Sequence, residues 1–274
     1  MMLSFKLGPL AISAELALLY LGLLCAWLTC WFLGHKRKAG PETPLFNLLL
    51  IGVLVARLAF VITYREFYYD GSWLAWLDIR DGGFLPLPGL IAALLAALWY
   101  FWRRPQLAMP LASGLVVGVV VSGMGLAVLH AMNQSQQLPQ LDLRNLAGEP
   151  VNLQDYQGKP VVINLWATWC PPCRREMPVL QQAQLDNPAV HFVFVNQGEG
   201  QHQVSSYIRK QDLHLENVLL DSGARLGTAV SSLSLPTTLF YDAGGSLQNT
   251  HLGELSEASL QHAMRNIQPN LAKE

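Results

Sequence analysis

The first half of the chain carries four long, nearly uninterrupted apolar stretches. They cover residues Leu10–Leu33, Leu45–Ile62, Leu85–Trp102 and Leu107–Ala131. Each has 18 or more residues, which is the length at which a helix crosses a hydrocarbon core of about 30 Å. The pattern therefore predicts an α-helical membrane domain with four spans in residues 1–132.

Two of these stretches contain a charged residue, and the third begins with prolines. Glu15 and Arg57 each lie toward one end of a stretch, where a long side chain can extend to the membrane interface. Pro86 and Pro88 fall in a first helical turn, where the missing N–H removes no helical hydrogen bond. We therefore expect interfacial charges here, in preference to a functional charge inside the membrane.

Basic residues between the stretches predict their orientation. Lys36–Lys38 follow the first stretch and Arg103–Arg104 follow the third, and such clusters stay on the cytoplasmic side. Everything after Ala131 is then expected on the opposite side of the membrane. Three basic residues count against this orientation: Lys6, Arg65 and Arg80.

After Ala131 the pattern changes to short segments. Residues 133–140 are polar and unpatterned, which predicts a linker. In residues 141–274, short apolar runs alternate with helical patterns, which predicts an α/β domain. The expected strands are Val161–Trp166, His191–Asn196, Val218–Leu220, Thr237–Tyr241 and Leu247–Leu252, and the expected helices are Arg174–Leu185, Val204–Gln211 and one capped by Ser256.

Composition and charge agree with this division. Of the 274 residues, 14% are charged, against about 25% in a soluble domain. The formal net charge is −1, so composition offers no sign of nucleic-acid binding. The composition therefore argues against both a disordered chain and a wholly soluble one.

Chemistry concentrates in Cys170-Pro171-Pro172-Cys173, directly after the predicted strand Val161–Trp166. A helix that begins here offers unpaired N–H groups and the positive end of its dipole, both of which stabilise a thiolate. The first cysteine, exposed at this end, is expected to be the nucleophile. The second, one turn further, can attack a mixed disulfide and release the product. The spacing and placement predict a redox-active dithiol.

The cysteine pair has three other interpretations: a structural zinc site, a permanent structural disulfide and a free cytosolic pair, the last of which the predicted orientation disfavours. A structural zinc site needs about four ligands, and the other cysteines, Cys25 and Cys30, lie inside the first apolar stretch. The histidines form no ligand spacing, so no metal is expected. The chain has no nicotinamide or flavin fingerprint, so no cofactor is expected either. A permanent structural disulfide remains open, although the strand-to-helix position favours catalysis.

The segments WATWCPPCRREMP and SLPTTLFYDAGG resemble the thioredoxin fold in its TlpA/ResA branch of membrane-tethered thiol–disulfide oxidoreductases. The resemblance covers Leu138–Ile267. It implies that Cys170 attacks, that Cys173 resolves, and that Pro236 is the cis-proline facing the dithiol. The backbone of Leu235 would then pair with a substrate strand.

The same resemblance directs attention to Glu176, which matches an acidic residue near the active site in this branch. We expect it to tune a thiol pKa or to accept the proton of the resolving cysteine; a solvated surface position is the open alternative. Asn164 stands where thioredoxins proper carry a buried acid, which strengthens the case for Glu176. Trp169 and Thr237 are expected to join Leu235 in binding substrate.

The N-terminal half resembles part of another family, prolipoprotein diacylglyceryl transferase. The similar segments are LGPLAIS, GVLVARLAF and DGGFLPLPGLIAALLAAL, within Leu7–Arg104. That family carries a functionally important His in its third span, whereas Gly82–Leu90 has none and Leu87 stands in its place. We therefore expect a reused membrane scaffold, with a lipid-modifying transferase bearing a redox appendage as the alternative.

Together these features predict a thiol–disulfide oxidoreductase, anchored in a bacterial inner membrane by several spans, with its catalytic domain in the periplasm. The resemblance implies disulfide reduction in exported proteins, with electrons from a membrane thiol donor of the DsbD type. The remaining partner is the lipid bilayer. A disulfide oxidase or isomerase is the nearest alternative. A change of about 30 mV in the reduction potential of the pair shifts the free energy of the two-electron exchange by about 1.4 kcal/mol, which is enough to alter the preferred direction. A non-catalytic binding module is the third, and the intact cysteine pair argues against it.

Overall fold

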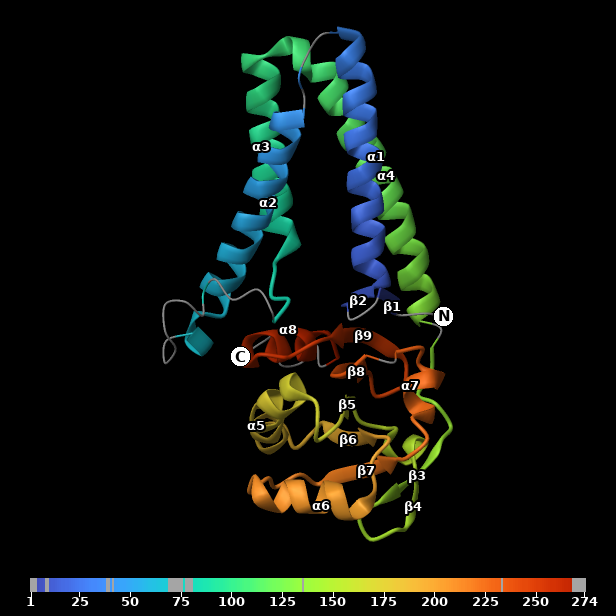
Figure 1. The fold of residues 1–274 in the computed structure, drawn as a ribbon. Coiled ribbons are helices and arrows are strands. Elements are labelled where there is room, and N and C mark those ends of the chain that lie inside the picture. The colour runs from blue at the N-terminus through green and yellow to red at the C-terminus, as the bar shows by residue number, and fades with distance from the viewer. Residues whose placement is uncertain are drawn as a thin grey trace. The chain divides into compact units, whose positions relative to one another are not determined.

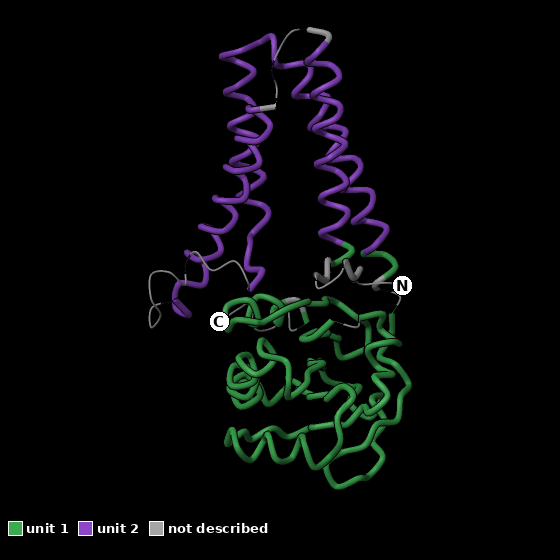
Figure 2. Tube along the Cα trace, in the orientation of Figure 1, with its two compact units in different colours: residues 1–14, 130–274 green, residues 15–129 purple. Residues whose placement is uncertain are grey.

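The structure, a computed structural model, describes residues 4–7, 10–37, 40, 42–68, 76, 81–134, 136–232 and 234–267. Lys38 and Arg80, two of the residues used above to orient the spans, lie outside these ranges. The chain divides into two compact units (Figure 2): residues 15–129, called the helical unit here, and residues 1–14 with 130–274, called the sheet unit.

Four long helices in the described chain confirm the four predicted spans, since each is long and apolar enough to cross a membrane. They are α1 (Ala14–Arg37), α2 (Glu42–Thr63), α3 (Pro86–Arg103) and α4 (Pro105–Gln134) (Figure 1), and the short helix η1 (Arg65–Tyr68) follows α2. The first span begins later than predicted. Strand β2 (Leu10–Ser13) pairs antiparallel with β1 (Ser4–Leu7), because the alternating residues of SFKL favour a strand.

Small residues bring the helices together in pairs. A Cβ added at Gly89 of α3 would lie 2.5 Å from the carbonyl oxygen of Gly52 of α2. A Cβ added at Gly118 of α4 would lie 3.0 Å from the Cβ of Ala26 of α1. In lipid no hydrophobic effect drives helices together, so close backbone approach and dispersion hold such pairs.

Arg57 differs from the sequence-based expectation, because it does not extend to the interface. It is 6% exposed, and its guanidinium donates to Asp81 Oδ1 at 2.9 Å and to the Gly83 carbonyl at 2.8 Å. The Tyr68 hydroxyl donates to the other oxygen of Asp81 at 2.9 Å. A buried charge requires such partners, and the loop before α3 supplies them.

The sheet unit contains a seven-stranded mixed sheet in the order β4-β3-β7-β6-β5-β8-β9. Strands β5, β6 and β7 are parallel, and β8 runs antiparallel to β5. The strands are β3 (Asp142–Asn145), β4 (Pro150–Asn152), β5 (Val161–Trp166), β6 (His191–Gln197), β7 (Asn217–Asp221), β8 (Thr237–Tyr241) and β9 (Leu247–Leu252). The expected α/β architecture is therefore confirmed, with β5, β8 and β9 at the predicted bounds.

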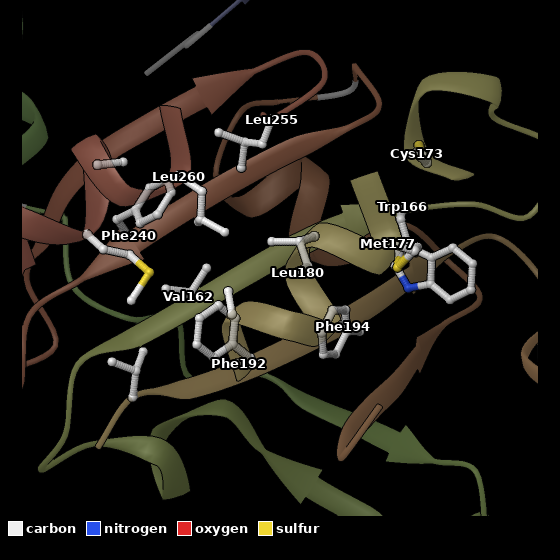
Figure 3. Packing of buried hydrophobic residues seen from close by; sticks show 14 of the residues in the cluster. Val162, Trp166, Cys173, Met177, Leu180, Phe192, Phe194, Phe240, Leu255 and Leu260 are labelled. Carbon is white, nitrogen blue, oxygen red and sulfur yellow. The ribbon is translucent and has the colours of Figure 1, made fainter. Parts of the chain in front are cut away.

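Helices cover both faces of this sheet. One buried cluster joins one face to α5 (Pro171–Asp186), α6 (Gln201–Lys210) and α8 (Glu257–Ile267); Figure 3 shows it, with Trp166 and Cys173 at the same end. The second cluster joins the other face to α7 (Arg225–Ala229) and η3 (Leu153–Tyr156). Every residue of β5 is buried, which fits its continuous apolar run.

The polar segment predicted as a linker is partly ordered by the sheet unit. Helix α4 continues to Gln134, and the N–H of Leu138 donates to the carbonyl of Gly245 at 2.8 Å. The N–H of Leu247 in turn donates to the Gln136 carbonyl at 2.9 Å. Backbone hydrogen bonds to the β8–β9 turn require no side-chain pattern, so the sequence did not reveal them.

Candidate dithiol active site

Cys170 and Cys173 form a disulfide where β5 gives way to α5, with a Cα–Cα distance of 5.3 Å. Cys170 is the N-cap residue of α5, and its Sγ accepts a hydrogen bond from the N–H of Cys173 at 3.3 Å. Pro171 and Pro172 occupy the first helical positions, where no N–H is needed. The sulfur of Cys170 therefore lies at the positive end of a helix dipole, where the N–H of Cys173 is the one that bonds to it, because both prolines lack an N–H.

The two cysteines are buried and the tryptophan before them is exposed. Cys170 is 3% exposed and Cys173 0% exposed, so the expectation that Cys170 is exposed does not hold in the disulfide form. The reason is that its sulfur is bonded inward to Cys173. Trp169 is 66% exposed, whereas Trp166 is fully buried.

Glu176 lies in the core and not on the surface, so the solvated alternative is wrong. It is 0% exposed. One carboxyl oxygen accepts a hydrogen bond from Asn164 Nδ2 at 2.8 Å, and the other accepts one from the N–H of Leu255 at 3.0 Å. Burial raises the pKa of Glu176 to about 8, and these two hydrogen bonds oppose the rise. This residue can therefore hold or release a proton near neutral pH.

Asn164 links Glu176 to the neighbouring strand. Its Nδ2 also donates to Thr238 Oγ1 on β8 at 3.0 Å. Asn164 and Thr238 are opposite each other in the β5–β8 register. The amide thus holds the carboxyl of the active-site helix against the central pair of strands.

The Leu235–Pro236 peptide bond is cis, as the family resemblance implies. Leu235 is half-buried and packs against both hydrophobic clusters. Thr237 is fully buried, and its hydroxyl donates to the Ser234 carbonyl at 2.6 Å and lies 2.8 Å from Ser232 Oγ. Of the three residues expected to bind substrate, Trp169 is therefore the one with a largely exposed side chain.

Glu199 was missed by the sequence interpretation. It follows β6 and is 6% exposed, and its carboxylate accepts hydrogen bonds from the N–H and the hydroxyl of Thr168, two residues before Cys170. The position of Glu199 shortly after a predicted strand is the signal that could have revealed it. Strands β5 and β6 are parallel, with Trp166 opposite Asn196, so the loops after both strands lie at the same edge of the sheet.

Comparison with known proteins places both halves of the chain. The profile of the AhpC/TSA family matches residues 135–250, and that of prolipoprotein diacylglyceryl transferase matches residues 2–129. Thioredoxin-like protein YneN of Bacillus subtilis is 34% identical over 137 residues, which cover 48% of this chain and 79% of that protein.

Two further matches are of the same kind. Thiol–disulfide oxidoreductase ResA of Halalkalibacterium halodurans is 30% identical over 129 residues, covering 46% of this chain and 73% of that protein. A solved structure of a secreted Mycobacterium tuberculosis disulfide oxidoreductase, homologous to E. coli DsbE, is 29% identical. It aligns with a TM-score of 0.41 over 45% of this chain and 93% of that one.

Proposed function

Because this chain belongs to the thioredoxin-like thiol–disulfide oxidoreductases, we propose that Cys170 is its attacking thiol and Cys173 its resolving thiol. The observation that carries this proposal is the position of Cys170 at the N-cap of α5, directly after the buried strand β5. At this position the sulfur accepts the N–H of Cys173 and faces the positive end of the helix dipole, and both favour the thiolate over the thiol. Cys173, one helical turn further, is already within bonding distance.

The proposed reaction reduces a disulfide in an exported protein. The Cys170 thiolate attacks one substrate sulfur, forming a mixed disulfide and releasing the other substrate sulfur as a thiolate. The Cys173 thiolate then attacks Cys170 Sγ and releases the second substrate thiolate. The substrate gains two electrons, and the Cys170–Cys173 pair loses them.

We propose that Glu176 serves the second step by accepting the proton of Cys173. Two observations support this role: its carboxyl is buried three residues after Cys173 on the same helix, and its pKa is about 8. A base with a pKa near that of a thiol and near the ambient pH transfers such a proton efficiently. Asn164 keeps this carboxyl in place from β5.

The substrate surface is proposed to include Trp169, the backbone of Leu235, and Thr237 beside the cis Pro236. The exposure of the Trp169 indole next to Cys170 supports contact with an extended polypeptide. The hydroxyl of Thr237 is bonded within its own loop. Its contribution is therefore proposed to come from its backbone and from shaping the loop.

The four-helix half is proposed to anchor the enzyme in a bacterial inner membrane, with the sheet unit in the periplasm and a membrane thiol donor of the DsbD type returning the electrons. The basic clusters after α1 and α3 support this orientation. Lipid transfer is not proposed. Although residues 2–129 match the transferase profile, residues Gly82–Leu90 contain no His.

The test uses the full-length protein in detergent and a peptide with one disulfide. Cys170→Ser is expected to abolish peptide reduction. Cys173→Ser is expected to accumulate a mixed disulfide with the peptide, because no resolving thiol remains. Cys25→Ser, which changes a cysteine of α1, is the matched control and is expected to react normally. Peptide reduction that persists in Cys170→Ser would overturn the proposal.

The direction of electron flow is tested separately by the reduction potential of the Cys170–Cys173 pair. A reductase is expected to lie near the value of thioredoxin, about −270 mV, and an oxidase near that of DsbA, about −120 mV. Equilibration of the full-length protein with thiol redox buffers, followed by mass spectrometry of the cysteine peptide, gives this value. A reduction potential near the DsbA value would contradict the proposed reductase and would indicate an oxidase.

A further inference from the structure

Glu199 has four hydrogen-bond donors around one buried carboxylate. Oε2 accepts from the Thr168 N–H at 2.7 Å and from Asn196 Nδ2 at 2.7 Å. Oε1 accepts from the Thr168 hydroxyl at 2.5 Å and from Gln203 Nε2. The donors come from the end of β6, the first turn of α6 and the loop before the cysteines. Glu199 therefore connects three elements by hydrogen bonds at the active-site edge of the sheet.

Thr168 connects this carboxylate to the dithiol. The N–H of Cys170 donates to the Ala167 carbonyl at 3.2 Å, which closes a turn that contains Thr168. The next turn begins at Cys170 itself, whose carbonyl accepts from the N–H of Arg174 at 3.1 Å. The position of Cys170 at the N-cap of α5 thus depends on where the Thr168 backbone is held.

All four groups that bond to Glu199, which come from three residues, act as donors, and this makes a carboxylate necessary. Gln203 Nε2 also donates to Thr168 Oγ1 at 3.2 Å, so the hydroxyl uses its own hydrogen toward Glu199. A glutamine in place of Glu199 would have one acceptor oxygen and an NH₂ group, and that NH₂ would face donors. An amide of the same shape cannot replace the carboxylate here.

We propose that Glu199 is a positioning residue for the thiol–disulfide reaction, holding Thr168 so that the sulfur of Cys170 stays at the N-terminus of α5. This inference rests on the proposed role of Cys170 as the attacking thiol. Glu199 acts through Thr168 and does not react with the substrate. Its effect is on the thiolate, because a sulfur displaced from the helix N-terminus loses the Cys173 N–H and the favourable helix dipole that stabilise its charge.

The experiment measures the rate at which Cys170 reacts with iodoacetamide as a function of pH. It uses full-length protein in detergent, with mass spectrometry of the Cys170 peptide and with Cys173→Ser as the background, so that no disulfide forms. Glu199→Gln is expected to slow the reaction at pH 7 about tenfold, the fall in thiolate that accompanies a rise of about one unit in the thiol pKa. It is also expected to raise the pH midpoint of the reaction.

The direction in which the pH midpoint shifts distinguishes a positioning role from a direct electrostatic effect of the charge. Removing a negative charge near a thiol, with no movement, lowers the thiol pKa, so a lower midpoint in Glu199→Gln would overturn the proposal. Thr168→Val changes no charge, keeps the N–H bond to Glu199 and removes the hydroxyl that bonds to Glu199 and Gln203. It is expected to raise the midpoint and slow the reaction about threefold, whereas Thr168→Ser, which keeps the hydroxyl, should react within about twofold of the background protein.

The controls separate this inference from the proposed function. Glu257→Gln removes an exposed carboxylate from the first turn of α8 and should leave the profile unchanged. If Cys170 reacts no faster than an ordinary thiol in the background protein itself, the proposed function fails. If Cys170 reacts fast in the background protein and equally fast in Thr168→Val, the positioning role is excluded. This result is decisive even if Glu199→Gln does not fold.

Discussion

Two buried carboxylates flank the dithiol, and the structure holds them in different ways. Glu176, after the cysteines, is fully buried and accepts hydrogen bonds from Asn164 and from the Leu255 N–H. Glu199, on the loop beside Thr168, is almost as buried and accepts from four donors. The number of donors, and not burial itself, is the main difference between the two sites.

This difference suits the two carboxylates to different work. At Glu176 two donors replace only part of the lost water, so burial raises its pKa to about 8 and the group can exchange a proton near neutral pH. At Glu199 four donors take the place of water. That carboxylate connects elements of the fold and fixes geometry. The proposed roles follow this difference, with proton transfer assigned to Glu176 and positioning to Glu199.

The largest expected effect concerns the pH dependence of stability at Glu176. Its pKa rises from 4.5 to about 8 on folding, so the native state keeps a proton that the unfolded chain releases. The stabilisation is complete below pH 4.5 and is lost as pH rises to about 8. At about 1.4 kcal/mol per pH unit, the loss is at most about 5 kcal/mol.

Glu176→Gln cannot ionise, so its free energy of opening should not show this fall. The measurement is hydrogen exchange of the amides of β5 in the oxidised full-length protein, corrected for the intrinsic effect of pH on exchange. Glu257→Gln is the control and should keep the slope of the unmodified protein. A Glu176→Gln protein with that same slope between pH 5 and 8 would show that Glu176 does not titrate as described.

A second pair of variants compares the two sites directly. Asn164→Asp places an acid 2.8 Å from Glu176, and Asn196→Asp places one 2.7 Å from Glu199. Each replaces a donor by a group of the same shape and a like charge. Glu176 keeps one donor, the Leu255 N–H, whereas Glu199 keeps three.

We therefore expect a greater loss of stability at pH 9 in Asn164→Asp, about 3–5 kcal/mol, than in Asn196→Asp, because an uncompensated buried charge carries a cost of this order. The exchange of β5 and β6 amides reports both losses. At pH 5 the loss in Asn164→Asp should be much smaller, since Glu176 is then protonated. Equal losses in the two variants at pH 9 would mean that donor number does not distinguish the sites.

A smaller effect is expected from Gln203→Ala, which removes one of the four donors of Glu199. Gln203 is exposed, so water can take its place and the loss should stay below about 1.5 kcal/mol. The Cys170 reaction rate should change less than in Thr168→Val, because both bonds between Thr168 and Glu199 remain and, at Thr168, only the bond from Gln203 to the hydroxyl is lost. Amide exchange in the first turn of α6 and the alkylation assay measure the two effects. If Gln203→Ala slowed the Cys170 reaction as much as Glu199→Gln does, the essential contact of Glu199 would be the one with α6 and not the one with Thr168.

The sequence predicted the elements that carry a strong local pattern and missed contacts between distant segments. The continuous apolar run of β5 gave its bounds correctly, and the two short segments of the hairpin formed by β8 and β9 were also predicted at their observed bounds. The strand β3 (Asp142–Asn145) is polar and short, and it forms because it pairs with β4 and β7. No local pattern shows such pairing in advance.

The same limit applies to the polar residues of both units. Cys170 and Cys173 were identified from their spacing and context, because the four consecutive residues Cys-Pro-Pro-Cys are a recognisable motif. Glu199 and Arg57 could not be assigned in this way. The partners of Glu199 lie up to 31 positions away in the sequence, and Asp81 lies 24 positions from Arg57. Whether a charge is exposed or paired in the core is decided by the tertiary fold.

The smallest expected effect comes from Glu254, whose charge raises the pKa of Glu176 by repulsion. Glu254 is itself paired with the exposed Arg175 at 2.5 Å, and such surface pairs contribute about 0–1 kcal/mol. Glu254→Gln should therefore lower the pH midpoint of Glu176 slightly and leave Thr168 and Glu199 unaffected. Titration of the Glu176 carboxyl by infrared spectroscopy measures this shift. A rise in the midpoint would mean that repulsion is not the dominant influence of Glu254 on Glu176.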